Sequence, residues 1–393
     1  MKEIDRWLLP EGIEEVLPPQ ARQLEALRRR LLDLYDSWGY DLVMPPFIEY
    51  LESLLTGTGH DLDLKTFKLT DQLTGRLMGV RADMTPQAAR IDAHHLKRNT
   101  PTRLCYMGTV LHSRPSGFAA SRSPMQVGAE LYGHAGVESD IEILALMVET
   151  LRLCGVEQSF FDLGHVGIYR GLARQAGLDS TQEDELFDVL QRKSQPDMRE
   201  LFAKWSLDNK LAEKFLGLSN LNGDVGVLLE AKKLLKGSDR TVLDALDYLQ
   251  QMADSIAQRL DGVAVHFDLA ELRGYNYHTG AVFAAFVPGQ GSAVAQGGRY
   301  DDIGQVFGRA RPATGFSTDL KTLLSLSGAQ PTAMSGIFAP AEQDPAINRA
   351  ISALRQQGER VVCALPGQQG GAKEMGCDRQ LLLKNQQWQV EPV

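Results

Sequence analysis

The sequence has few cysteines, and their spacing excludes the common metal and redox motifs. Four occur among 393 residues, Cys105, Cys154, Cys363 and Cys377, and no two of them form a C-x-x-C pair. Such pairs are typical of zinc sites and dithiol redox sites. We therefore expect reduced thiols, as in proteins of the cytoplasm, with no metal site and no cofactor.

Long apolar runs and an excess of positive charge are absent as well. The run Ala281–Val287 has the length of a strand and ends at Pro288, whereas a transmembrane helix needs about 20 apolar residues. Charged residues among the first six argue against a signal peptide. The formal net charge of -9 argues against a nucleic-acid partner, because phosphate contacts require clustered Lys and Arg. The sequence predicts a cytoplasmic protein with no membrane or tRNA partner.

Hydrophobic periodicity predicts helices and strands that alternate irregularly along the chain. Expected helices are residues 20–38, 85–98, 138–154, 319–326 and 345–357, and expected strands are residues 40–44, 65–69, 76–80, 104–111, 125–132, 263–269, 280–287, 292–296, 336–339 and 360–365. Strands adjacent in sequence that pair as hairpins favour an α+β fold with a mostly antiparallel sheet. We expect a core domain over residues 1–330, with a strand-free helical insertion at about 172–260, and a small C-terminal α/β domain over 331–393.

Polar side chains share one face of an expected strand. Gln126 and Glu130 are four residues apart and therefore project to the same side of the sheet. Upstream, Asp83 and Thr85 belong to an Asp-x-Thr-Pro segment. A carboxylate beside a hydroxyl suits an ammonium ion, but the same pattern is also typical of a helix N-cap. Thr85 can serve both purposes.

Two glycine-containing segments follow the expected insertion. They are Leu272-Arg273-Gly274-Tyr275-Asn276-Tyr277-His278-Thr279-Gly280 and Gln296-Gly297-Gly298-Arg299-Tyr300-Asp301-Asp302. Glycines at such positions let the backbone approach a ligand closely. A strand with an ordinary tyrosine-rich face is the alternative, and the paired glycine segments make it the weaker interpretation.

Together these segments resemble histidyl-tRNA synthetase, a class II aminoacyl-tRNA synthetase. The two glycine-containing segments resemble its histidine-specific signatures, and residues 39–49, 106–133 and 312–320 resemble motifs 1, 2 and 3. The resemblance covers roughly the first 325 residues and implies the class II fold. It also implies a histidine-binding site, whose residues are Asp83, Thr85, His112, Gln126, Glu130, Arg273, Tyr277 and His278. In that family the segment matching Asp83 and Thr85 binds the ammonium group of histidine, and the arginine matching Arg273 acts on its carboxylate. The pair of aromatic residues at the positions of Tyr277 and His278 lines the imidazole pocket.

The chain departs from the synthetase pattern where the family binds ATP. His112 and Thr322 stand at positions where the family has arginines for the α- and γ-phosphates. Histidine is mostly uncharged near neutral pH and lacks the guanidinium fork. Removing one such donor costs on the order of 10²–10³ in rate, so adenylation should be negligible. Asp83, Asn276 and His278 also replace the family's glutamate, acid and tyrosine.

A histidine pocket beside an altered ATP site resembles the regulatory-subunit family of short-form ATP phosphoribosyltransferase. The resemblance implies a non-catalytic protein that binds histidine as an effector and assembles with the short catalytic subunit. It would activate and feedback-regulate that subunit in the first step of histidine biosynthesis. Motif 1 implies a homodimer within a larger hetero-oligomer, and the tail from residue 331 is too short for an anticodon-binding domain.

Two alternatives stay open at this point. The chain could be an active or divergent histidyl-tRNA synthetase-like ligase, although His112 and Thr322 argue against this. It could also be a synthetase-like paralogue that binds or modifies another amino acid, a carrier protein or a kinase.

Overall fold

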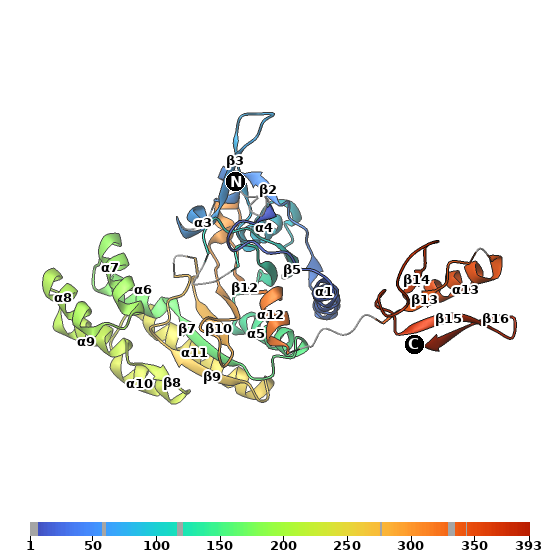
Figure 1. Ribbon diagram of the computed structural model, residues 1–393. Helices are drawn as coiled ribbons and strands as arrows, with labels where there is room; N and C mark the ends of the chain where they lie inside the picture. The colour runs from blue at the N-terminus through green and yellow to red at the C-terminus, as the bar shows by residue number, and fades with distance from the viewer. Residues whose placement is uncertain (1–6, 57–59, 116–120, 276, 329–334, 343) are drawn as a thin grey trace. The chain divides into compact units, whose positions relative to one another are not determined.

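The computed structural model describes residues 7–56, 60–115, 121–275, 277–328, 335–342 and 344–393, which form two compact units (Figure 1). One unit contains the described residues up to Glu15 together with Leu24–Gly328. The other contains Val16–Gln23 and the described residues from Ser335 onward. Within these described residues, no helix is long and apolar enough to cross a membrane.

A nine-stranded sheet forms the centre of the larger unit (Figure 1). Its strands, in spatial order, are β1 (Asp41–Leu42), β5 (Thr102–Thr109), β6 (Met125–Tyr132), β12 (Ala313–Asp319), β11 (Ala295–Arg299), β10 (Ala281–Phe286), β7 (Phe160–His165), β9 (Ala264–Asp268) and β8 (Asn222–Gly223). The pairs β1–β5 and β7–β9 are parallel, and the other neighbours are antiparallel. A separate three-stranded sheet has the order β2 (Ile48–Tyr50), β4 (Leu77–Val80), β3 (Phe67–Thr70). The predicted α+β architecture is confirmed.

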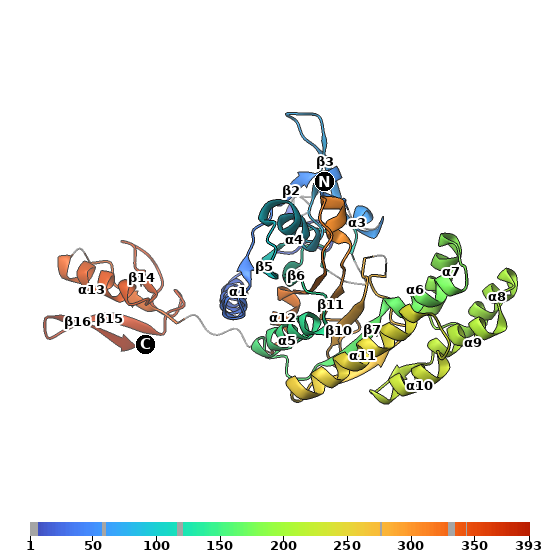
Figure 2. The ribbon, with the colours of Figure 1, turned by 180° about the vertical axis from the view of Figure 1, so that it is seen from behind.

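Helices cover this sheet with apolar faces. Helix α1 (Gln20–Ser37) buries Leu24, Leu27, Leu31 and Tyr35, whose spacing is that of one helix face. Helices α5 (Val137–Leu153) and α11 (Arg240–Arg259) pack against each other and against strands of the sheet (Figure 2). The remaining helices of this unit are α2 (Leu51–Leu54), α3 (His60–Lys65), α4 (Thr85–Arg90), the π-helix η2 (Ile91–Leu96), α6 (Val166–Gln175), α7 (Ser180–Gln191), α8 (Gln195–Trp205), α9 (Asn209–Leu218), α10 (Gly226–Leu234), the 3-10 helix η3 (Ile303–Phe307) and α12 (Leu320–Leu326).

The region expected to be a helical insertion does contain the group α7–α10, which lies to one side of the sheet (Figure 1). It also contains the short strand β8, which pairs with β9. The expectation of no strand here was therefore wrong. Strand β8 is an edge strand of two residues, which is too short to show the alternating pattern from which strands are predicted.

Four further strands of the larger unit differ from the sequence expectation. Strands β2, β7 and β12 were missed, and β11 begins three residues later than expected and includes Gly297 and Gly298. Glycine has a low intrinsic preference for strands, and pairing on both sides overrides that preference here. A Cβ on Gly297 would come within 2.8 Å of the Phe316 Cα, so the close approach of β12 requires glycine.

The smaller unit contains a four-stranded sheet with the order β14 (Val361–Cys363), β13 (Ile337–Ala339), β15 (Arg379–Lys384), β16 (Gln387–Pro392). Helix α13 (Pro345–Gln356) buries Ile347 and Ile351 against this sheet. The hairpin β15–β16 was not predicted, because the sequence was read as a glycine-rich loop after β14. A parallel β13–β14 pair joined through α13 agrees with the expected α/β pattern.

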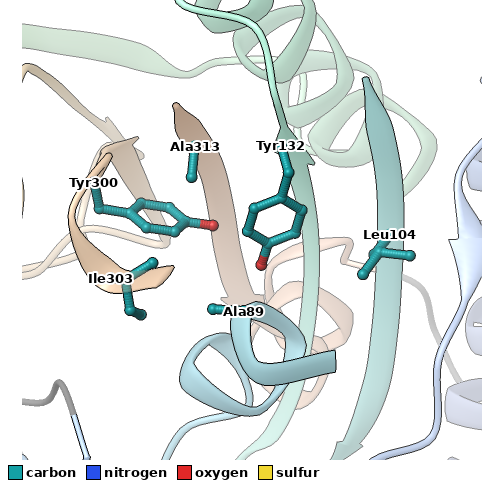
Figure 3. Close-up of a cluster of buried hydrophobic side chains, with 6 residues drawn as sticks. All are labelled: Ala89, Leu104, Tyr132, Tyr300, Ile303 and Ala313. Carbon is teal, nitrogen blue, oxygen red and sulfur yellow. The ribbon is translucent and has the colours of Figure 1, made fainter. Parts of the chain in front are cut away.

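An aromatic cluster lies at the core of the larger unit, where β6, β12 and the segment after β11 meet. Figure 3 shows Tyr300 and Tyr132 directed toward one another among Ala89, Leu104, Ile303 and Ala313. The two tyrosine rings meet edge to face, with centroids 6.5 Å apart at 82°, which is a favourable aromatic arrangement. Tyr277 packs against the same cluster, so this core is continuous with the site described below.

A buried ion pair joins the helical layer to the sheet. The Arg299 guanidinium on β11 donates to both Asp140 oxygens on α5, at 3.0 and 3.1 Å, and the side chains are 6% and 0% exposed. Arg299 also donates to the backbone oxygens of His134 and Gly136. Tyr248 on α11 donates a further hydrogen bond to Asp140. One guanidinium thus connects β11, α5 and α11.

Replacing Asp140 with alanine is expected to lower the free energy of unfolding by about 3–5 kcal/mol, because it removes the buried counter-charge of Arg299 and leaves only the longer contact with the more exposed Asp301. Denaturant unfolding followed by circular dichroism measures the loss. Asp244→Ala, on α11, removes the exposed pair with Arg240 and is the control, with an expected change below about 1 kcal/mol. Equal losses in the two variants would contradict the assigned role of the buried pair.

Candidate functional site

A cavity opens in the larger unit beside the central strands β6, β12, β11 and β10 and the loop that follows β9. Its volume is about 170 Å³, roughly ten times what one bound water requires. The residues that line it are Asp83, Thr85, Glu130, Glu271, Arg273, Gly274, Tyr277, His278, Val282, Phe283, Ala284, Gln296, Gly297, Gly298, Tyr300, Gly315, Phe316 and Ser317. Residues from both glycine-containing segments and from both polar segments upstream therefore meet at one place.

Glu130, on β6, lies at the buried end of the cavity and is 1% exposed. The hydroxyl of Tyr106 donates to its Oε1 at 2.8 Å, and the hydroxyl of Tyr300 donates to its Oε2. Gly315 is its partner on the adjacent strand β12, and a Cβ at that position would overlap the carboxylate. The glycine in β12 therefore makes room for Glu130.

Asp83 and Gln126 form one hydrogen-bonded group beside Glu130. Gln126 Nε2 donates to Asp83 Oδ1 at 2.7 Å, and Gln126 Oε1 accepts from the Met84 backbone at 2.8 Å. Asp83 also accepts from the backbone N–H of Thr85 at 3.0 Å. The Thr85 hydroxyl lies 2.8 Å from the Tyr106 hydroxyl. Gln126 thus fixes the orientation of Asp83 and does not itself line the cavity.

Tyr277 and His278 close another side of the cavity. Their backbone N–H groups both donate to the Gly274 oxygen at 2.8 Å, and Gly274 adopts a φ of 64° that favours glycine. Within the described part of the chain, Tyr277 Oη and His278 Nδ1 are buried without a hydrogen-bond partner. Buried polar atoms are rarely left unpaired, and these two belong to residues that line the cavity.

Arg273 was expected to face the carboxylate of a ligand. It does line the cavity, but its Nη2 lies 2.9 Å from Glu271 Oε2. Its guanidinium also lies 4.7 Å from the centre of the Phe286 ring. Arg273 therefore already has an anionic partner, which a ligand carboxylate would have to share or displace.

The two positions that replace phosphate arginines serve local structure. His112 Nε2 lies 2.9 Å from the Ala82 oxygen and donates to it. The Thr322 hydroxyl donates to Asp319 Oδ2 at 2.8 Å, within the N-terminal cap of α12. Arg122, in the loop between β5 and β6, donates to the backbone oxygens of His112 and Glu11.

Of the eight predicted site residues, six line the cavity. Gln126 acts through Asp83, and His112 is not among the lining residues. The prediction missed Tyr300, Glu271 and the carboxylate partner Tyr106. Tyr300 lies inside a recognised signature and alternates with Arg299, so strand alternation could have placed it on the cavity side. No sequence signal indicated Glu271.

Comparison with known proteins identifies the family to which this geometry belongs. The family model for histidyl-tRNA synthetase matches residues 12–323, and the model for the ATP phosphoribosyltransferase subunit HisZ C-terminal domain matches residues 334–391. A relative in Thioalkalivibrio sulfidiphilus named ATP phosphoribosyltransferase regulatory subunit is 63% identical over 393 residues, which is 99% of each chain. A relative of the same name in Pseudomonas aeruginosa is 56% identical over 395 residues, covering 100% of each. The chain belongs to the ATP phosphoribosyltransferase regulatory subunit family.

Solved structures agree with this family and confirm the class II synthetase-like fold. A regulatory subunit/histidyl-tRNA synthetase from Bacillus halodurans C matches with a TM-score of 0.83 and 27% identity, over 94% of this chain and 95% of that chain. Histidyl-tRNA synthetase from Nostoc sp. PCC 7120 matches in fold, with a TM-score of 0.77 at 20% identity, over 96% and 91%. The names of the relatives confirm the prediction of a regulatory rather than catalytic subunit and argue against the ligase alternative.

The cavity of this regulatory subunit carries more acidic than basic groups. Asp83, Glu130 and Glu271 line it together with one guanidinium, that of Arg273. Burial raises the pKa of Glu130 to about 8, although hydrogen bonds from Tyr300 and Tyr106 oppose the shift. Burial lowers the pKa of His278 to about 3, so its ring is neutral near pH 7. The raised pKa of Glu130 keeps a proton on its carboxyl group at neutral pH, and a bound cation could take the place of that proton.

The raised pKa of Glu130 predicts a specific dependence of stability on pH. The ordinary pKa is 4.5 and the folded pKa is about 8, so between these values the folded chain keeps a proton that the unfolded chain has lost. This contribution is fully present below pH 4.5 and is lost as the pH rises through 8. Glu130→Gln should remove it, at up to about 1.4 kcal/mol per pH unit.

Urea unfolding of the wild type and of Glu130→Gln at pH 5, pH 6.5 and pH 8 measures this difference. The variant should gain stability relative to the wild type as the pH rises. A difference that stays constant across the three pH values would show that Glu130 does not carry the buried proton.

Proposed function

We propose that this chain binds free histidine in the cavity and, as the regulatory subunit of a hetero-oligomer with the catalytic ATP phosphoribosyltransferase subunit, controls that enzyme in histidine biosynthesis. The names of its relatives, ATP phosphoribosyltransferase regulatory subunit, support the catalytic partner in this proposal. Within this proposal the regulatory subunit activates the catalytic subunit, and histidine reverses the activation. The polar and charged groups that line the cavity support histidine as the effector.

The observation that carries the proposal is the pair of buried atoms without partners, Tyr277 Oη and His278 Nδ1. A neutral imidazole has one donor nitrogen and one acceptor nitrogen. A phenol can donate or accept, and the neutral His278 ring offers a nitrogen whose role depends on its tautomer. The two side chains can therefore serve both nitrogens of a histidine ring.

The backbone groups of an amino acid also have suitable partners. Asp83 and Glu130 provide carboxyl groups for an ammonium ion, which has three donors. Arg273 can bind the ligand carboxylate by sharing its fork with Glu271. An acidic cavity with one guanidinium at its side thus fits a zwitterion that carries an additional polar ring.

Regulation requires that histidine bind the inhibited state of the complex more tightly than the active state. Coupling free energies between sites are typically about 1–3 kcal/mol, or roughly 5- to 150-fold in affinity. Substitution of a cavity residue should therefore change inhibition by histidine while the complex with the catalytic subunit still forms. A weakened phosphate subsite at His112 and Thr322 is consistent with a protein that senses histidine without activating it.

Tyr277→Phe and Glu130→Ala are expected to weaken histidine binding, by about tenfold or more for the buried charge partner Glu130. Calorimetry with the full chain measures the affinity, and an activity titration of the reconstituted complex measures the inhibition curve. Both curves should shift together toward higher histidine concentration, while co-purification with the catalytic subunit persists.

Thr322→Ala is the matched control, since it removes a hydrogen bond outside the cavity. It should leave histidine affinity unchanged. Wild-type protein that binds no histidine alone or in the complex would exclude this cavity as the sensor, as would inhibition curves that coincide for the wild type and both variants.

We further propose that residues 331–393 form a domain separate from the core at 1–330, and that the chain does not bind tRNA. The support is the family model that matches residues 334–391, which belongs to the regulatory subunit. The acidic net charge of -9 is consistent with this proposal.

A homodimer through the motif 1 region is also proposed. Apolar side chains around β1 and β2 are exposed, with Met44 at 81% and Phe47 at 40%, and β1 is an edge strand of the large sheet. Exposed apolar groups that gather at a sheet edge are typical of an interface. A two-fold interface would cover them.

Light scattering of the isolated chain at micromolar concentration should give the mass of a dimer. Met44→Asp combined with Phe47→Asp should shift it toward the monomer, because each copy would bury unpaired charge. Leu73→Asp, at an exposed turn between β3 and β4, should leave the mass unchanged. A monomeric wild type would contradict the proposal.

A further inference from the structure

The side chain of Tyr275 attaches the segment that carries Arg273, Tyr277 and His278 to helix α7 of the helical group α7–α10. This tyrosine is 7% exposed and is not among the residues that line the cavity. Its hydroxyl donates to Glu183 Oε1 in the first turn of α7. Its ring lies 5.3 Å from the ring of Phe187, also on α7.

Helix α6 holds the same tyrosine from other directions. The Tyr169 ring meets it edge to face at 5.2 Å, and the Arg170 guanidinium lies 4.7 Å from the centre of the Tyr275 ring. Arg170 Nη2 also donates to the Tyr275 backbone oxygen at 2.6 Å. The Tyr169 hydroxyl donates to the Glu183 backbone oxygen at 2.6 Å, which joins α6 to α7 at the same point.

The other end of the segment is fixed to the sheet. The Thr279 N–H donates to the Arg299 oxygen at 2.7 Å, and the Asp301 N–H donates to the Thr279 hydroxyl at 2.9 Å. The ligand-facing residues Tyr277 and His278 therefore lie between an anchor on the rigid sheet and an anchor on the helices. Packed interiors respond to small displacements by switching contacts rather than by deforming smoothly. A shift of Tyr277 or His278 on ligand binding must then be absorbed on the helical side.

We propose that Tyr275 is a positioning residue that couples occupancy of the cavity to the packing of α7 and the helices that follow it. The inference rests on the proposed binding of histidine. In this arrangement the bond between Tyr275 and Glu183 holds the segment in the geometry that binds histidine, and histidine in turn stabilises the docking of α7. The coupling is reciprocal, as any linkage between two equilibria must be.

The test combines histidine calorimetry on the full chain with hydrogen exchange of residues 180–191, measured with and without saturating histidine. In the wild type, histidine should slow exchange in α7. Tyr275→Phe keeps the ring but loses the bond to Glu183, so histidine affinity should fall roughly 5-fold or more, and the protection of α7 by histidine should be lost.

Variants of Glu183 provide the second arm. Glu183→Ala should match Tyr275→Phe, and the double variant should be no weaker than either single variant, because both remove the same interaction. Glu183→Gln keeps an acceptor oxygen and should retain affinity within about twofold. Tyr40→Phe is the control, since it removes a comparable bond from a tyrosine hydroxyl to Glu142 that is remote from the segment.

The outcomes separate the two proposals. If the wild type binds no histidine, the proposed function fails and this inference fails with it. If the wild type binds histidine but Tyr275→Phe and Glu183→Ala bind it equally well and keep the protection of α7, only the coupling is overturned. Lower thermal stability in these variants with unchanged affinity and unchanged exchange would likewise show a merely structural role.

Discussion

The buried pair of Arg299 and Asp140 is the interaction on which the position of the whole site depends. Arg299 points to the helical layer, and the next residue, Tyr300, points to the cavity and donates to Glu130. The Arg299 backbone oxygen also holds Thr279, at the end of the segment that bears Tyr277 and His278. Arg299 therefore fixes the sheet to the helices, and the next residue, Tyr300, fixes Glu130 on the cavity side.

The charge of the cavity follows from that placement. Glu130 is buried where solvent cannot stabilise its ionised form, and its neighbours donate neutral hydrogen bonds rather than a positive charge. Neutralisation must come from a proton or from a cationic ligand. A site in which a ligand ammonium replaces a proton can distinguish an amino acid from a neutral molecule of equal size, so the acidic excess is a source of selectivity as well as affinity.

The family's phosphate positions show how a catalytic subsite can be converted into structure. His112 and Thr322 each satisfy a nearby backbone or carboxylate acceptor, and Arg122 binds carbonyl oxygens. Within the described residues, His112 Nδ1 is buried without a hydrogen-bond partner, as are Tyr277 Oη and His278 Nδ1 on residues that line the cavity. What His112 and Thr322 lack is the permanent charge and the fork of a guanidinium, so these positions contribute local structure rather than a phosphate contact.

Much of the fold and most of the cavity could be predicted from sequence, because antiparallel hairpins and signature segments are encoded locally. Features that depend on distant pairing could not be predicted, as β7, β12 and the hairpin β15–β16 show. Glu271 and Tyr106 illustrate the same limit within the site, since each acquires its role from a partner brought in by folding. Tyr275 is the clearest case. In the sequence it is one aromatic residue of a signature, and only the packing of α6 and α7 shows that it faces away from the ligand site and toward the helices.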